Sequence, residues 1–267
     1  MSATSHQSVE PLTGAFPWIG GKRVLAKTIL PRIDAVPHVC FAEPFVGAGG
    51  IFLRRRHRSR SEAINDRSND IAGFFRVLQR HPDALLEELS ARLTSRAEHE
   101  RLRASDPTGM TDIERAARFY YLQYCAYGGK PEAVWAGSAL SRARFNITRL
   151  RPMLRRIHER LAAVYIDCLD FEAFIRRWDR PTTLFYIDPP YWGCERYYGK
   201  NLFAREDFER LAGVLRGIQG RFIMSLNDRS EVREIFAGFQ VETVETVYRV
   251  AGPAQPVTEL LISDGRG

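Results

Sequence analysis

The chain has 267 residues, of which 45% are hydrophobic and 27% are charged, values close to ordinary globular usage. This length can bury one large core, or one core with an inserted lobe, and it excludes a wholly disordered protein. No apolar run approaches the roughly 20 residues that a membrane span needs, so we expect no contact with a membrane. The first seven residues are polar and lack the pattern of a secretion signal, which indicates a cytoplasmic protein.

Basic residues outnumber acidic ones, 39 against 32, and the formal net charge is +7. The excess is concentrated between Ala72 and Arg160, where 16 Lys and Arg residues accompany 10 Asp and Glu residues. A polyanion is the natural partner of such a segment, although a solvated helical surface would carry the same charge. The four cysteines lie far apart and form no Cys-x-x-Cys, so we expect neither a metal site nor a disulfide framework.

Three regions separate along the chain by hydrophobic pattern. In the first region, which ends near Ile71, helices and strands alternate, and this alternation favours a parallel sheet flanked by helices. The elements expected there are helices at 22–30 and 49–56 and strands at 38–42 and 62–65.

The second region is helix-rich and basic, with no dominant strand pattern, and strands return in the third. The strands expected in the third region are 163–166, 183–187, 221–226, 239–250 and 258–262, with helices at 171–178 and 205–218. We therefore expect an α/β sheet domain built from residues 1–71 and 161–267, interrupted by a helical lobe at 72–160.

An aromatic residue and a lysine flank a tight turn in Trp18-Ile-Gly-Gly-Lys22. Because Arg23 follows the lysine, the pattern Gly-x-x-x-x-Gly-Lys-Ser/Thr is absent and nucleotide triphosphate hydrolysis is unsupported. A lysine at such a turn can instead pair with a ligand carboxylate, and the indole can cover an adenine or a cationic sulfonium. In isolation the same stretch would be interpreted as a structural turn.

A glycine-rich turn follows the first expected strand, 38–42, in Glu43-Pro-Phe-Val-Gly-Ala-Gly-Gly50. Glycines there let the backbone turn sharply and approach a ligand closely. Phe52 stands where a dinucleotide fingerprint needs a third small residue, so a nicotinamide-dependent oxidoreductase is disfavoured. A lone glycine turn could simply join a strand to a helix.

Asp66 ends the next expected strand, sixteen residues after Gly50. A carboxylate at that place can accept hydrogen bonds from both hydroxyls of a ribose bound across the glycine turn. The alternative role is a helix N-cap, which Ser68, Asn69 or Asp70 could fill as well. The glycine turn upstream favours ribose binding over helix capping as the role of Asp66.

The most informative stretch is Asp188-Pro-Pro-Tyr191, which directly follows the apolar run 183–187. Two prolines fix the backbone, so the Asp188 side chain and the Pro189 carbonyl can present two acceptors in a fixed relation. An exocyclic amino group donates two hydrogens, and binding both directs its lone pair toward an incoming methyl group. Tyr191 offers a face for a planar base, which an enzyme must first extrude from a duplex. The alternative is a rigid turn.

Together these motifs resemble the Dam-type (alpha-group) family of DNA adenine N6-methyltransferases, in which cofactor motifs precede the target-recognition region and Asp-Pro-Pro-Tyr follows it. The matching stretches occur in the family's order and span about two thirds of the chain, at 18–22, 43–50, 65–70 and 187–193.

The resemblance implies a Rossmann-like methyltransferase sheet that uses S-adenosylmethionine, with an inserted helical lobe for target recognition. It implies methyl transfer to the N6 amino group of adenine in double-stranded DNA, by base flipping and direct in-line transfer. We expect no metal and no covalent intermediate, and we expect a monomer.

The resemblance also implies roles for individual residues. Those expected to bind S-adenosylmethionine are Trp18, Lys22, Glu43, Phe45, Gly47, Gly49, Gly50, Asp66 and Asp188. Those expected to hold the target adenine are Asp188, Pro189, Pro190 and Tyr191.

Seven arginines lie between Ala139 and Arg160 with a single acidic residue, a composition that suits phosphate contact better than base reading. Candidate DNA contacts among them are Arg142, Arg144 and Arg149. The stretch 144–149 departs from the Phe-Asn-Val-Pro-Phe-Gly type found in members that read GATC, so the target sequence stays open. A second group of arginines, between 54 and 60, is interpreted as one exposed helix end.

Other functions share parts of this pattern. An amino-methyltransferase acting on cytosine N4 or on RNA would use the same acceptors, but Asp188 and Tyr191 favour adenine in DNA over versions of the motif that begin with Ser or Asn. A catalytically silent DNA-binding relative would keep the fold, and the intact Asp188 and glycine turn argue against it. A cytosine C5 enzyme would need a nucleophilic cysteine after a proline, and the sequence has no Pro-Cys pair.

Overall fold

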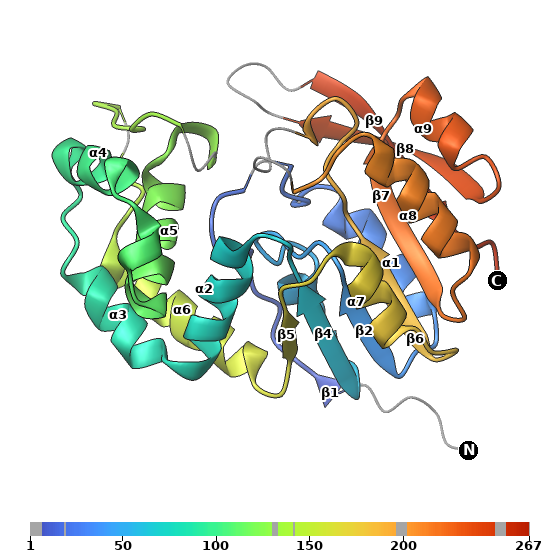
Figure 1. The fold of residues 1–267 in the computed structure, drawn as a ribbon, viewed down its shortest axis with the longest axis horizontal. Helices are drawn as coiled ribbons and strands as arrows, with labels where there is room; N and C mark the ends of the chain where they lie inside the picture. The colour runs from blue at the N-terminus through green and yellow to red at the C-terminus, as the bar shows by residue number, and fades with distance from the viewer. Residues whose placement is uncertain are drawn as a thin grey trace.

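The computed structural model describes residues 7–18, 20–129, 133–140, 142–195, 202–248 and 255–266. Two parts lie side by side in Figure 1, a sheet with helices on both faces and a group of helices at one edge of the sheet. This arrangement confirms the expected α/β class.

The sheet has seven strands in the order β5-β4-β2-β6-β7-β9-β8. Their bounds are β2 Cys40–Glu43, β4 Ser61–Asn65, β5 Tyr165–Asp167, β6 Thr183–Ile187, β7 Arg221–Asn227, β8 Gln240–Tyr248 and β9 Gln255–Ser263. The first five strands of the order run parallel, and β9 runs antiparallel to both of its neighbours. All seven expected strands are confirmed, with ends that differ by a few residues.

The connection of the strands creates a reversal point between β2 and β6. After β2 the chain adds β4 and β5 on one side, then returns to place β6 on the other side of β2. In open α/β sheets a ligand binds outside the carboxyl ends of the strands at such a point, because the connections there diverge and leave a crevice. The carboxyl ends that meet at this crevice are those of β2, β4 and β6.

Alternation along the strands directs side chains to two cores. In β6, Leu184 and Tyr186 join the core under α1 (Ala26–Ala35) and the helical lobe, whereas Phe185 and Ile187 join the core on the opposite face. The helices that cover this second core are α7 (Phe171–Trp178), α8 (Glu206–Arg216) and α9 (Ser230–Ile235). Both faces are therefore covered, which suits strands that are apolar throughout.

The lobe at the edge of the sheet is built from helices (Figure 1). They are α2 Asn69–Arg80, α3 Pro82–Ser90, α4 Arg96–Ala104, α5 Asp112–Cys125 and α6 Ile147–Leu161. Thr111 and Glu114 form a reciprocal capping box that fixes the start of α5, and the Asn146 side chain caps α6. The boundaries predicted at 72 and 160 fall within α2 and α6.

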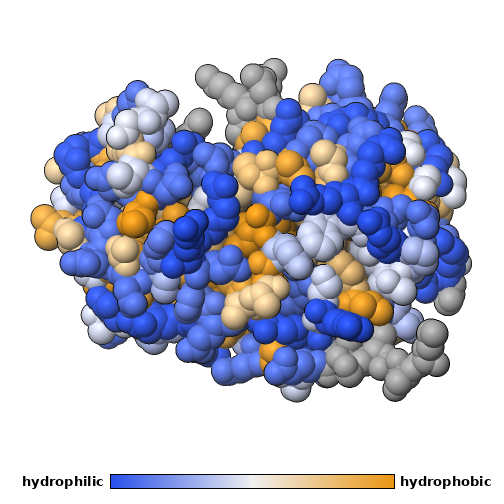
Figure 2. All heavy atoms as spheres, turned by 60° about the horizontal axis from the view of Figure 1, so that its bottom comes forward, coloured by the Kyte–Doolittle hydropathy of each residue, from blue (hydrophilic) through white to orange (hydrophobic). Residues whose placement is uncertain are grey.

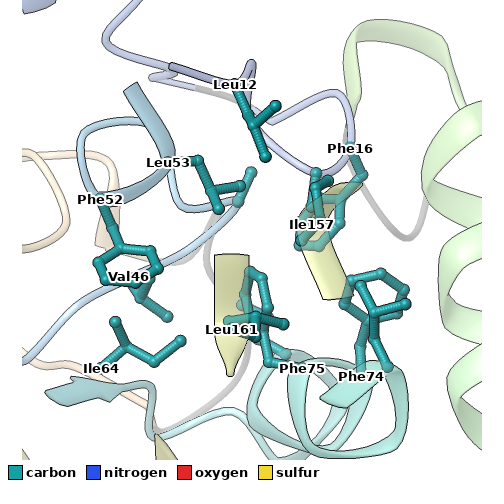
Figure 3. Close-up of a cluster of buried hydrophobic side chains, with 14 of the residues drawn as sticks. Leu12, Phe16, Val46, Phe52, Leu53, Ile64, Phe74, Phe75, Ile157 and Leu161 are labelled. Carbon is teal, nitrogen blue, oxygen red and sulfur yellow. The ribbon is translucent and has the colours of Figure 1, made fainter. Parts of the chain in front are cut away.

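The lobe and the sheet share one core, which Figure 3 shows from the inside. Phe74 and Phe75 of α2 and Ile157 and Leu161 of α6 point toward residues of the N-terminal segment and of the glycine-rich turn. The residues labelled there are Leu12 and Phe16 of the N-terminal segment, Val46 of the turn, and Phe52 and Leu53 directly after it. Since this packing buries side chains from both parts, the lobe is held in a fixed orientation beside the crevice.

The prediction of a helix at 49–56 is wrong. The chain there forms a turn and a short 3-10 helix, η1 (Phe52–Arg54), and then β3 (His57–Arg58), which pairs with β1 (Gln7–Ser8). The helix cannot continue because Arg55 turns inward, and its side chain lies 2.5 Å from Glu62 of β4.

The expectation of one exposed helix end across residues 54–60 is also wrong, because Arg55 belongs to a buried charge cluster. The Glu62 carboxylate forms ion pairs with Arg55 at 2.5 Å and with Arg160, the penultimate residue of α6, at 2.6 Å. The two guanidinium groups lie over the rings of Phe41 and Phe52, at 3.8 and 4.1 Å from the ring centres. Buried arginines need such partners, and this cluster connects the end of the lobe to β4.

Hydrophilic residues cover most of the face drawn in Figure 2, and hydrophobic residues gather chiefly near its middle, between the lobe and the sheet. Within the described ranges, every helix is too short or too polar to cross a membrane.

Candidate active site

A cleft of about 780 Å³, counting space open to solvent, lies at the carboxyl ends of β2, β4 and β6. Nine predicted site residues line it, namely Trp18, Lys22, Glu43, Phe45, Gly47, Gly50, Asp66, Asp188 and Pro190. They come from four separate stretches of sequence, and the fold brings them together.

The glycine turn is held by the aspartate at the end of the neighbouring strand. Asp66 accepts a hydrogen bond from the Gly47 backbone N–H at 3.1 Å and another from the Ser68 N–H at 2.9 Å. Gly47 has φ +49°, and a Cβ placed on it would lie 2.9 Å from Nε1 of Trp18. Only glycine satisfies both the backbone angle and this close approach.

Gly49 is placed differently from the other predicted glycines. Its φ is +72°, and a Cβ there would meet Leu53 at 3.0 Å and Phe75 at 3.6 Å, both core residues. Gly49 does not line the cleft. It serves the turn by letting the backbone lie against the core.

Burial raises the pKa of Asp66 to about 6, and the two backbone hydrogen bonds lower it only in part. The carboxylate therefore stands in the cleft with a titration point close to neutrality. It caps no helix through its side chain; α2 begins at Asn69, after Ser68, whose side chain makes no capping bond.

Glu43 stands at the end of β2 with a side chain almost completely buried. Its Oε1 atom has no hydrogen-bond partner among the residues that the structure describes. Burial holds its pKa well above the usual range, and Arg55 opposes this shift. A buried carboxyl with an unused oxygen in a cleft is a group that a ligand donor can satisfy.

Asp188 follows β6 and is held from one side. Its Oδ1 atom lies 2.7 Å from Nζ of Lys22 and accepts a hydrogen bond from Ser225 at 3.2 Å. The Ser225 hydroxyl lies 2.8 Å from that of Tyr186. Within the described ranges, Oδ2 has no such partner. Burial raises the pKa of Asp188, and the Lys22 ammonium opposes that shift.

The loop after Asp188 is fixed by side chains from the next two strands. Pro189 is buried beside the cleft, and the Tyr191 hydroxyl donates to Oε1 of Glu259 on β9 at 2.5 Å. Asn227, at the end of β7, accepts from the Trp192 N–H at 2.9 Å and donates to its carbonyl at 3.1 Å. The Lys22 ammonium lies 4.5 Å from the centre of the Tyr191 ring.

Sequence reasoning missed three residues of this arrangement, Ser225, Asn227 and Glu259. The available signal was a polar residue inside an apolar strand, as in Phe-Ile-Met-Ser225-Leu and Thr-Glu259-Leu-Leu. A buried polar group in such a run requires a partner, but the sequence alone does not identify it.

One wall of the cleft was also missed. Arg67 follows Asp66, lines the cleft and donates to the Leu202 carbonyl at 3.2 Å and to Asp170 at 3.3 Å. Leu202 and Phe203 complete this wall, and Phe45 packs on Phe203 with ring centres 5.8 Å apart. The result is an apolar side wall facing the polar groups of the floor.

The predicted DNA contacts lie on the lobe outside the cleft. Arg142, Arg144 and Arg149 are exposed, and Arg144 donates to the Ala126 carbonyl at 3.3 Å. The remaining arginines of the same run bind the chain itself: Arg151 contacts Ser90, Arg155 pairs with Asp83, Arg156 with Glu10 and Arg160 with Glu62.

The lobe touches the cleft through the end of α5. Gln123 donates to the Pro17 carbonyl at 2.9 Å and to the Gly129 carbonyl at 3.2 Å. A Cβ on Gly129 would lie 3.0 Å from the Pro17 backbone. The loop that leads to the exposed arginines therefore begins against the segment that carries Trp18.

Comparison with known proteins gives a consistent picture. The model of the D12 class N6 adenine-specific DNA methyltransferase family matches residues 18–250. The chain is 26% identical to the DNA adenine methylase of Haemophilus influenzae over 268 residues, covering 92% of this chain and 91% of that protein.

Two further relatives are type II methyltransferases. The chain is 21% identical to M.CviBI of Paramecium bursaria Chlorella virus NC1A, covering 87% of this chain and 89% of that protein. It is 23% identical to M.MjaIII of Methanocaldococcus jannaschii, covering 85% and 89%. These matches extend across both the cleft and the lobe.

Proposed function

The chain belongs to the D12 class N6 adenine-specific DNA methyltransferase family, and we propose that its cleft binds S-adenosylmethionine while the loop from Asp188 to Tyr191 holds the target adenine of a DNA duplex. The observation that carries this proposal is the carboxylate of Asp188 at the reversal point of the sheet, with one oxygen fixed and the other available.

The residues of the cleft fit the chemical groups of S-adenosylmethionine. The unused Oε1 of the buried Glu43 suits the ligand's ammonium group, and Asp66 suits the two ribose hydroxyls. The buried ammonium of Lys22 suits the ligand carboxylate. The apolar wall of Phe45, Leu202 and Phe203 suits the adenine ring. When bound, the ligand supplies an electrophilic methyl group on a sulfonium.

Asp188 and Pro189 orient the acceptor nitrogen. The free Oδ2 of Asp188 and the Pro189 carbonyl accept the two hydrogens of the adenine amino group, which directs the nitrogen lone pair toward the cleft. Because Lys22 and Ser225 fix the other carboxylate oxygen, Asp188 needs little reorganisation when the base enters. Positioning of the two reactants then supplies most of the rate.

Asp188 can also take part in the loss of the proton. The amino nitrogen gains positive charge as it accepts the methyl group, and a carboxylate within hydrogen-bond distance stabilises that charge and accepts a proton afterwards. Burial raises the pKa of Asp188, which makes the carboxylate a better proton acceptor than an exposed one.

The base reaches this loop by extrusion from the duplex, because its amino group is inaccessible within the stack. Tyr191 provides the stacking face, and the exposed Arg142, Arg144 and Arg149 contact the backbone phosphates beside it. We further propose that the enzyme acts as a monomer, since one chain supplies all the cleft residues named above.

The direct test is transfer of labelled methyl from S-adenosylmethionine to duplex DNA, followed by hydrolysis and identification of the modified nucleoside. We expect N6-methyladenine. Recovery of N4-methylcytosine alone, transfer to RNA alone, or no transfer would contradict the proposal. Sequencing DNA from an expressing strain by a method that reports methylated bases would then give the target sequence.

A further inference from the structure

We propose that Glu259 of β9 is a positioning residue for methyl transfer, because it fixes the Tyr191 ring on which the target base stacks. This inference rests on the proposed function and adds a strand that no sequence motif connects to the site. It assigns a task to a carboxyl group that would otherwise be costly to bury.

The placement of Glu259 needs an explanation. Its side chain has 0% exposure, and Leu261, two residues further along β9 on the same face, is also buried. A buried carboxylate is costly unless strong hydrogen bonds offset the loss of water. The Tyr191 hydroxyl makes such a bond, with the two oxygens 2.5 Å apart.

Glu259 acts together with the residue directly opposite it. Asn227 of β7 and Glu259 of β9 are cross-strand partners, so their side chains lie on the same face of the sheet. Asn227 holds the backbone of Trp192 through two hydrogen bonds, and Glu259 holds the side chain of the preceding residue. The pair therefore fixes both the path of the loop and the rotation of the ring.

The same ring is linked to the catalytic carboxylate. Nζ of Lys22 lies 4.5 Å from the centre of the Tyr191 ring and 2.7 Å from Oδ1 of Asp188. Holding the ring through its hydroxyl thus sets the distance between the stacking face and the acceptor oxygens. A small error in such a distance lowers the rate of methyl transfer strongly, since the reacting atoms must meet in line.

The hydrogen bond also has an electronic consequence. A phenol that donates to a carboxylate gains electron density in its ring, and an electron-rich face attracts positive charge more strongly. As the methyl group moves, positive charge passes from the sulfonium to the amino nitrogen of the stacked adenine. Glu259, acting through Tyr191, favours the state in which the base carries that charge.

The experiment compares Tyr191→Phe, Glu259→Leu and the double variant with the wild-type enzyme, by single-turnover methyl transfer at saturating S-adenosylmethionine and duplex DNA. We expect each single variant to lower the rate by about ten- to a hundredfold, while the dissociation constant for S-adenosylmethionine changes by less than about threefold. Because both substitutions break one bond, the double variant should be no slower than the slower single variant.

The matched control is Thr246→Val, which changes another buried polar residue of the β8–β9 hairpin. It should leave the rate unchanged. A DNA duplex with 2-aminopurine in place of the target adenine adds a second measurement, because its fluorescence rises when the base leaves the stack. We expect the two single variants to extrude this base but to hold it with a different fluorescence anisotropy.

Three results would overturn the inference: a folded Glu259→Leu enzyme with the wild-type rate, losses that multiply in the double variant, or a loss confined to S-adenosylmethionine affinity. If Glu259→Leu does not fold, Tyr191→Phe decides, because it removes a single oxygen; a wild-type rate for that variant would reject the role. A wild-type enzyme that methylates no adenine would instead refute the proposed function.

Discussion

The cleft and the helical lobe differ in how their polar side chains are held. In the cleft, polar side chains are buried and already held by the chain, as when Lys22 and Ser225 fix one oxygen of Asp188. On the lobe, Arg142 and Arg149 are exposed. On our proposal, chemistry that needs exact geometry is preorganised, whereas contact with the DNA backbone is left to side chains that can adjust.

Within the lobe, one run of arginines contains both kinds of side chain, exposed ones and ones bound to the same chain. Those near its exposed loop face solvent, and those further along α6 bind Asp83, Glu10 or Glu62 of the same chain. A high local positive charge in the sequence therefore overstates the number of arginines available to DNA.

The largest expected effect comes from removing the carboxylate of the cleft. Asp188→Ala should lower methyl transfer by about a thousandfold or more, because the amino group loses an acceptor and the proton loses its destination. DNA affinity in a mobility-shift assay should change little, since we place the phosphate contacts on the lobe. The control is Asp228→Ala, which removes a surface carboxylate paired with Arg233 near the end of the adjacent strand.

Wild-type turnover by Asp188→Ala would show that the cleft is not the catalytic part of the molecule. An equal loss of DNA affinity would show that cleft and lobe are not divided as the structure suggests.

The cleft could be predicted from sequence because its residues stand in short motifs whose spacing encodes local geometry. The apolar run 183–187 is β6 to the residue, so the position of Asp188 at a strand end followed directly. Glycines at Gly47 and Gly50 and the carboxylate at Asp66 were likewise placed by the strand–turn pattern.

The supporting residues could not be predicted, because their partners are distant in sequence. Glu259 and Tyr191 are 68 residues apart, and only the pairing of β7 with β9 brings them together. The burial of Arg55 also depends on tertiary contacts, since its partners are Glu62 of β4, Ser59 and His38. A periodic pattern reports the local element and says nothing of these tertiary contacts.

A second effect, smaller than that at Asp188, should divide the arginines of the lobe. Replacing Arg142, Arg144 and Arg149 together by Gln should weaken DNA binding by roughly tenfold or more. It should also reduce the magnitude of the negative slope of log K against log salt by about 2–3. The matched control replaces Arg151, Arg155 and Arg156, which bind Ser90, Asp83 and Glu10. Titrations of a fluorescent duplex at several salt concentrations measure both quantities.

If the control variant loses as much affinity as the first, the paired arginines release their partners to bind DNA. That result would place the DNA surface along the whole of α6 rather than at its exposed start.

A third effect tests the fixed backbone of the cleft. Gly47→Ala should weaken S-adenosylmethionine binding by about tenfold and lower the midpoint of thermal unfolding, because φ of +49° costs ~1–2 kcal/mol for alanine and the new Cβ meets Trp18. Gly213→Ala is the control; it lies within α8 with no atom within 4 Å of its Cβ position. Calorimetric titration and thermal unfolding should show a neutral or stabilising effect there.

The smallest expected effect is a pH dependence that belongs to the cleft alone. Burial raises the pKa of Asp66 to about 6, and ribose hydroxyls donate to its ionised form. S-adenosylmethionine affinity should therefore be constant well above pH 6 and fall on acidification, by about fourfold at pH 5.5. DNA affinity of the lobe should show no such step.

The same group should act on stability with the opposite sign. The folded pKa lies above the unfolded value of about 3.9, so the folded state binds the extra proton. The stability that Asp66 contributes is present at low pH and is lost as pH rises from about 4 to about 6. Asp66→Asn should abolish both trends, whereas Asp70→Asn, which changes the partner of Arg115, should keep them. S-adenosylmethionine affinity and the free energy of unfolding, measured between pH 4 and 8, test both trends. Trends that persist in Asp66→Asn would assign the titration to another group.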